Sequence, residues 1–118
     1  MNLILKKAFQ NEMQIAKDFY LQGDWVKCFT HLERAHVLGQ RHAIPHTINH
    51  WWMLKVGFKR RDHREIWGQI VRILVAGIGS VIGRAPIGNT GGANVPILKP
   101  LPIPADLQKI FERAENRS

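Results

Sequence analysis

Hydrophobic side chains recur at helical spacing near the start of the chain and predict a first helix over residues 2–22. The stripe consists of residues three or four positions apart: Leu5, Phe9, Met13, Ala16 and Tyr20. Glu12 borders this stripe, whereas the opposite side of the helix is polar. We predict that Gly23 ends the helix in a left-handed conformation and that Asp24 caps the next helix.

A second stripe predicts a helix over residues 25–39. Its buried face combines aromatic, aliphatic and small residues with one histidine: Trp25, Cys28, Phe29, Leu32, Ala35 and His36. At 100° per residue His36 falls near the middle of this face, with Glu33 on its flank. Gly39 is suited to end the helix.

Two further helices are predicted over residues 45–60 and 63–82. Pro45 suits the first turn of the third helix, because its missing N–H is not needed there. Apolar residues occupy nearly all sides of this helix, which is typical of a central helix. His46 and His50 lie one turn apart and are therefore expected to point into the protein. Asp62 and Glu65 form a capping-box-like start for the fourth helix.

The remaining chain changes in character, because residues 84–104 contain five of the six prolines. We predict an extended segment that wraps across the helices, with turns at Gly88-Asn89 and Gly91-Gly92. A short terminal helix over 105–115 follows. The expected fold is thus all-α and a single domain over 1–118. It comprises four main antiparallel helices in a body over 1–83, the wrapping segment and the terminal helix.

The first two helices resemble a tetratricopeptide-type helical hairpin. The resemblance rests on small and aromatic residues around a Gly-Asp turn: Ala16, Tyr20, Gly23, Asp24, Trp25, Leu32 and Ala35. One such hairpin cannot bury its own apolar face, and about three copies are needed for a stable array. Because a single copy is recognisable, the resemblance implies antiparallel hairpin packing, not a repeat array.

The bulk composition limits the class of protein. The 118 residues are 45% hydrophobic, which fits one domain with a sizeable core. The single cysteine, Cys28, permits no internal disulfide and favours a reducing, cytoplasmic location. No signal peptide is expected. Gln69 and Arg72 interrupt the apolar run over 66–82, so it falls short of the roughly 20 predominantly apolar residues of a membrane span.

The net charge of +8 permits a nucleic acid or another anionic partner. A run of basic residues at the predicted end of the third helix, Lys59 to Arg61, is equally explained by the helix dipole. Binding of nucleic acid through residues 55–72 would be strongly salt-dependent. No recognition motif supports nucleic-acid binding. A protein partner, a small-molecule partner and a homo-oligomer remain alternatives.

The histidines supply the candidate chemistry, because five of the six fall between Asp24 and Trp52. Glu33-x-x-His36 and His46-x-x-x-His50 each place two potential ligands on one side of a helix. Together they predict an internal site for zinc, iron, copper or nickel, with Glu12 as the next carboxylate. Two polar residues are candidates to orient the ligands: Gln40 and Asn49.

Alternatives accompany this hypothesis. Buried histidines also serve as structural hydrogen-bonding groups, and His36 paired with Glu12 or Glu33 would fix helix packing. The protein would then be a non-catalytic interaction module of the hairpin type. His42 is either a ligand or a surface residue, and His31 and His63 are expected to face solvent. Cys28 is expected in the core. The Gly88–Asn94 loop either binds an anion or makes a tight turn.

Several segments together resemble an uncharacterised bacterial domain family of about this length. They are His31–Gln40 (HLERAHVLGQ), His46, His50, Gly68-Gln69, Gly88–Gly91 and Pro102–Pro104. The resemblance covers nearly the whole chain. It implies that the Glu/His cluster and the Gly-Asn-Thr-Gly loop are family features, and it implies no particular reaction.

Overall fold

The computed structural model of the protein describes residues 1–82, 91–93 and 99–116, with the backbone alone for 76–82. These residues form five helices and no strand, so the predicted all-α fold is confirmed. The helices are α1 (Leu3–Gln22), α2 (Trp25–Gly39), α3 (Ala43–Arg60), α4 (His63–Ile82) and α5 (Ala105–Asn116). No helix in these ranges is long and apolar enough to cross a membrane.

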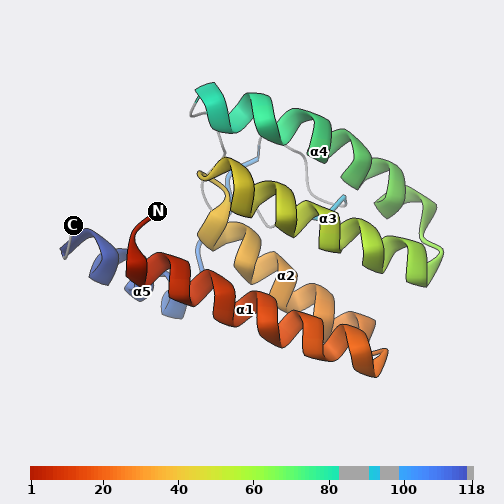
Figure 1. Ribbon diagram of the computed structural model, residues 1–118, viewed down its shortest axis with the longest axis horizontal. Coiled ribbons are helices and arrows are strands. Elements are labelled where there is room, and N and C mark those ends of the chain that lie inside the picture. The colour runs from red at the N-terminus through yellow and green to blue at the C-terminus, as the bar shows by residue number, and fades with distance from the viewer. Residues whose placement is uncertain (83–90, 94–98, 117–118) are drawn as a thin grey trace.

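The first four helices follow one another as antiparallel neighbours (Figure 1). α1 packs on α2, α2 on α3 and α3 on α4, while α5 returns to pack on α1 and α2. The N- and C-termini consequently lie at the same end of the molecule (Figure 1), where the Asn2 amide donates to the carbonyl of Ala114 at 3.2 Å. The apolar core lies where α1, α2, α3 and α5 meet.

The predicted helix boundaries between α1 and α2 are confirmed. Gly23 has φ +75°, and its N–H donates to the carbonyls of Phe19 and Tyr20. The carboxylate of Asp24 accepts from the N–H of Lys27 at 3.1 Å. Both features close the turn by satisfying backbone groups that the helix ends leave open.

Aromatic rings join this turn to α3. The Tyr20 ring meets Trp25 edge-on at 5.3 Å between centroids and Trp52 at 5.4 Å. Edge-to-face pairs at such distances stabilise packing beyond the area they bury. This cluster packs the middle of α3 against the turn between α1 and α2.

Two predictions about helix starts need correction. α3 begins at Ala43, two residues before Pro45. A proline is tolerated at this third helical position because the first four N–H groups of a helix have no partner within the helix. The carboxylate of Asp62 does cap α4 by accepting from the N–H of Glu65 at 3.1 Å. The Glu65 side chain, however, turns toward residue Ala93 and does not complete a capping box.

Only part of the predicted wrapping segment can be compared with the structure. The turn expected at Gly88-Asn89 lies outside the described residues. Gly91 adopts φ +83°, a left-handed conformation that favours glycine. It places residues 91–93, which we call the 91–93 loop, against α2 and α4.

Candidate metal centre

The corner between α2 and α3 brings the histidine segments together. Only residues 40–42 separate the two helices. The missing side chain of Gly39 makes room at this corner, because a Cβ there would lie 3.2 Å from Pro45 of α3 and 2.9 Å from the Phe9 ring of α1. As a result the last turn of α2, which carries His36, faces the first turns of α3, which carry His46 and His50.

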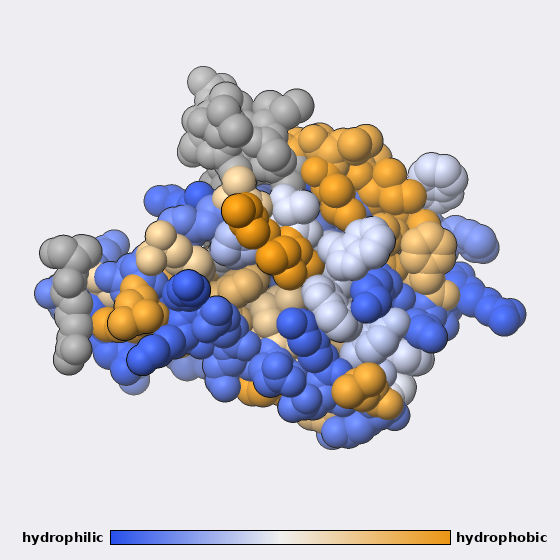
Figure 2. Space-filling view, in the orientation of Figure 1, coloured by the Kyte–Doolittle hydropathy of each residue, from blue (hydrophilic) through white to orange (hydrophobic). Residues whose placement is uncertain are grey.

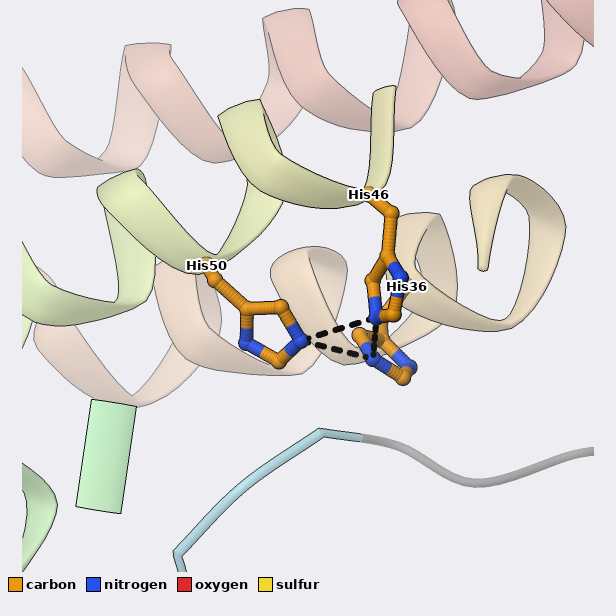
Figure 3. Close-up of side chains that lie close together, drawn as sticks. All are labelled: His36, His46 and His50. Carbon is orange, nitrogen blue, oxygen red and sulfur yellow. Dashed lines mark hydrogen bonds between the residues drawn. The ribbon is translucent and has the colours of Figure 1, made fainter. Parts of the chain in front are cut away.

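Three buried imidazoles converge at this corner (Figure 3). The Nε2 atom of His36 lies 3.0 Å from that of His46 and 3.1 Å from that of His50. The Nε2 atoms of His46 and His50 are 2.9 Å apart. Among the described residues, this His36–His46–His50 triad is the group whose ligand atoms lie close enough together to hold one metal ion.

Gln69 of α4 fixes the tautomer of His50. The Gln69 side-chain nitrogen donates to two acceptors, the Gly91 carbonyl at 2.8 Å and the Glu65 carboxylate at 3.1 Å. Its oxygen therefore points to His50 Nδ1, at 2.6 Å, and that ring nitrogen must carry the proton. In a neutral imidazole the Nε2 atom is then unprotonated, so its lone pair faces the other two histidines.

Burial keeps two of the rings neutral. Desolvation lowers the pKa of His46 to about 4. Desolvation, followed by the proximity of His46, lowers the pKa of His50 to about 3. Neutral imidazole is the form that binds a metal ion. Both rings therefore have their binding form at neutral pH.

The 91–93 loop covers one side of the triad and is held by the same polar residues. A Cβ on Gly91 would lie 2.5 Å from the His36 ring, so the loop backbone packs directly on that imidazole. The carboxylate of Glu65 accepts from the N–H of Ala93 at 2.8 Å. Glu65 and Gln69 thus connect α4, the loop and the triad in one hydrogen-bonded network.

The two glutamates expected as ligands lie elsewhere. Glu12 is buried, but its carboxylate contacts His31 Nδ1 at 2.6 Å and Arg34 Nε at 2.9 Å. Arg34 in turn binds Asp106 of α5. Glu33 lines a cavity of about 280 Å³ on the α2, α3 and α4 side. Neither carboxylate belongs to the converging group.

The other histidines differ in environment. His31, expected to face solvent, instead stacks on Phe19 at 5.8 Å between centroids and pairs with Glu12. It lies on the flank of α2 that faces α1. The prediction from helical spacing had placed it on the outward side of the helix. His42 is partly buried at the start of α3, and His63 is exposed. Cys28 is a core residue as predicted, with its pKa raised to about 11 by burial and by Asp24.

The polar residues that hold the triad were not those expected. Asn49 donates to the Leu32 carbonyl at 2.8 Å, which links α3 to the turn of α2 that precedes His36. Gln40 lines a separate cavity beside α5. Gln69 contacts the ring of His50, and the signal for it was present: Glu65, Gln69 and Arg72 recur at helical spacing within an apolar helix.

The comparisons with known proteins identify a family but no activity. No curated protein and no solved structure matches the chain. One family model, described as a protein of unknown function (DUF3703), matches residues 4–111. This match confirms the expectation of an uncharacterised family, and the tetratricopeptide likeness stays a prediction. The chain therefore belongs to the DUF3703 family.

Proposed function

We propose that the protein binds one transition-metal ion through the Nε2 atoms of His36, His46 and His50. The observation that supports it is the mutual spacing of these atoms, 2.9–3.1 Å. One ion could bind all three nitrogens at the usual zinc–nitrogen distance of about 2.0–2.1 Å. With three protein ligands, a further coordination position would be open to water or a substrate, as in catalytic zinc sites.

The donor set indicates which ions would bind. Three imidazole nitrogens without a carboxylate suit zinc, copper, nickel or iron and are poor ligands for magnesium or calcium. The hydrogen bond from His50 to Gln69 is the kind of contact that orients a metal-binding imidazole and raises its basicity. Glu33 and Glu12 are less suited to complete the site, because both lie outside the converging group.

A purely structural role for the triad explains the geometry less well. Three ring nitrogens that meet at one point compete for the same hydrogen-bonding direction. Because His50 Nε2 is an acceptor, only one of the other two rings can donate to it in good alignment. A cation at the meeting point satisfies all three lone pairs at once. We therefore favour a metal site over a purely structural role for the three histidines.

The test is metal binding by tag-free protein. After treatment with a chelator, calorimetric titration with zinc should show one ion per chain, and cobalt should give the visible absorption of a low-coordinate nitrogen site. The variants His36→Ala, His46→Ala and His50→Ala should each lose this binding. His63→Ala is the matched control, because His63 is exposed and outside the triad.

A ligand that binds only the folded state also raises stability. At a free metal concentration about a thousandfold above Kd, the free energy of unfolding should rise by about 4 kcal/mol. Binding of no zinc, copper, nickel or iron would refute the proposal. So would binding that the triad variants retain in full.

A further inference from the structure

A large apolar face lies on the outer side of α3 and α4. We call it the α3–α4 face and define it by eight hydrophobic residues, each between 38% and 74% exposed. Those of α3 are Ile44, Ile48, Trp51 and Phe58, and those of α4 are Trp67, Val71, Leu74 and Val75. Figure 2 shows hydrophobic surface gathered over α4 and continuing toward α3.

The spacing and charge of this face differ from those of a solvated helix. Its α4 residues follow at intervals of four, three and one, which is the pattern of a buried stripe. Between Ile66 and Val75 the one charged residue is Arg72. Arg72 is buried, and its guanidinium donates to the Gly68 carbonyl. The exposed side of this part of α4 therefore carries no charge.

Because of the position of α4, none of the other described helices covers this face. Within the described residues, α4 packs on α3 and has no comparable contact with α1, α2 or α5. The α3–α4 pair is thus an antiparallel hairpin at one side of the molecule (Figure 1). Two such hairpins, packed by their apolar sides, form a four-helix bundle.

The size of the face fits a protein partner. At these exposures the eight side chains leave on the order of 900 Å² of apolar surface in water. The largest patch on a typical monomer is roughly 300–600 Å². A standard protein interface buries roughly 800 Å² per partner. We propose that a second copy of this chain covers the α3–α4 face, so that the protein is a two-fold dimer.

The charge distribution indicates how the two copies lie. Four exposed basic residues gather at the α3–α4 turn: Lys59, Arg60, Arg61 and Arg64. With a net charge of +8 on each chain, two such turns repel one another. An antiparallel arrangement of the hairpins places them at opposite ends of the bundle. Dimerisation should accordingly persist or tighten as salt is added, because salt screens this repulsion.

Two leucine variants test the proposal. Leu74→Glu places a carboxylate on the α3–α4 face, whereas Leu21→Glu does the same at an exposed leucine of α1, away from it. In a two-fold dimer each substitution is present twice, once in each chain. We expect Leu74→Glu to weaken self-association by at least about a hundredfold, since a buried unpaired charge is costly. Leu21→Glu should dimerise as the unaltered protein does.

The measurement is molar mass by analytical ultracentrifugation at micromolar concentrations, at low and high salt, with helical content checked by circular dichroism. Metal-free protein should dimerise as well, so this result is independent of the metal site. A monomeric unaltered protein would overturn the proposal, as would equal behaviour of the two variants. Salt-sensitive binding of the monomer to vesicles containing phosphatidylserine would assign the face to an anionic membrane surface instead.

Discussion

The Nδ1–H of His50 donates to the side-chain oxygen of Gln69 at 2.6 Å, and this bond joins α3 to α4. The same Gln69 amide donates to the carbonyl of Gly91, which packs on the ring of His36. One side chain therefore fixes the tautomer of one triad member and holds the backbone that covers another.

Replacing Gln69 with leucine should distinguish its role in orienting His50 from its contribution to packing. Gln69→Leu removes the acceptor for His50 and the donor to Gly91 while keeping the side chain apolar. We expect zinc affinity to fall about 10–100-fold, as for other groups that orient a metal-binding imidazole. The free energy of unfolding of metal-free protein should fall by about 1–3 kcal/mol, because polar groups lose their partners.

Competition with a chelator gives the affinity, and denaturant unfolding gives the stability. Gln14→Leu is the control, since Gln14 is an exposed residue of α1 that bonds Asp18. A loss of stability without any change in zinc affinity would show that Gln69 has no part in the site.

Two glycines with the same backbone conformation allow steric contact to be distinguished from backbone strain. Gly91 has φ +83° and Gly23 has φ +75°, but a Cβ at Gly91 would meet the His36 ring, whereas one at Gly23 would meet nothing within 4 Å. Gly91→Ala and Gly23→Ala both impose a left-handed conformation on alanine, at a cost of about 1–3 kcal/mol. Gly91→Ala should be the more destabilising of the two.

The same pair should differ in metal binding. Gly91→Ala must displace either the loop or His36 and should weaken zinc binding, while Gly23→Ala should leave it intact. Thermal unfolding and zinc titration of both variants check this. Equal stability losses, with zinc affinity unaltered in both, would mean that the loop does not constrain the triad.

The buried carboxylate of Glu12 should matter for stability and not for metal binding. Glu12→Gln weakens its contacts with His31 and Arg34, and Arg34 also binds Asp106 of α5. We expect the free energy of unfolding to fall by about 1–3 kcal/mol. Amide hydrogen exchange should also rise in α5. Zinc affinity should be unchanged; a marked loss of zinc binding would return Glu12 to the candidate ligands.

Metal-free protein should lose stability in mild acid because of His46 and His50. Their folded-state pKa values, about 4 and about 3, lie below the value near 6.5 expected in the unfolded chain. Between these limits the unfolded state binds more protons, so stability falls as pH falls below about 6.5. Each histidine contributes on the order of 1 kcal/mol per pH unit in that window.

Urea unfolding at a series of pH values between about 7 and 5 measures this slope. A variant with His46→Gln and His50→Gln, which has no titrating group at either position, should show a shallower dependence. Identical slopes for the two proteins would contradict the burial of neutral imidazoles.

Local features of the fold were predictable from the sequence because their causes are local. The turn at Gly23 and Asp24 and the spacing of Leu5, Phe9 and Met13 depend on residues within one or two helical turns. The start of α3 was placed two residues late, because Pro45 is compatible with several positions in a first turn. The inward direction of His46 and His50 followed from helical periodicity in the same way.

The site required contacts between distant segments, and only the tertiary structure decided those. His36 meets His46 and His50 because Gly39 allows α2 and α3 to approach closely, which no helical wheel can measure. Glu12 lies beside the inner stripe of α1, as the sequence indicated. Because α1 packs on α2 and α5, the Glu12 carboxylate contacts His31 and Arg34. The sequence determined which side chains are available on each helix face. The way successive helices pack on one another determined which of these side chains share a hydrogen bond, and with it the role of Gln69.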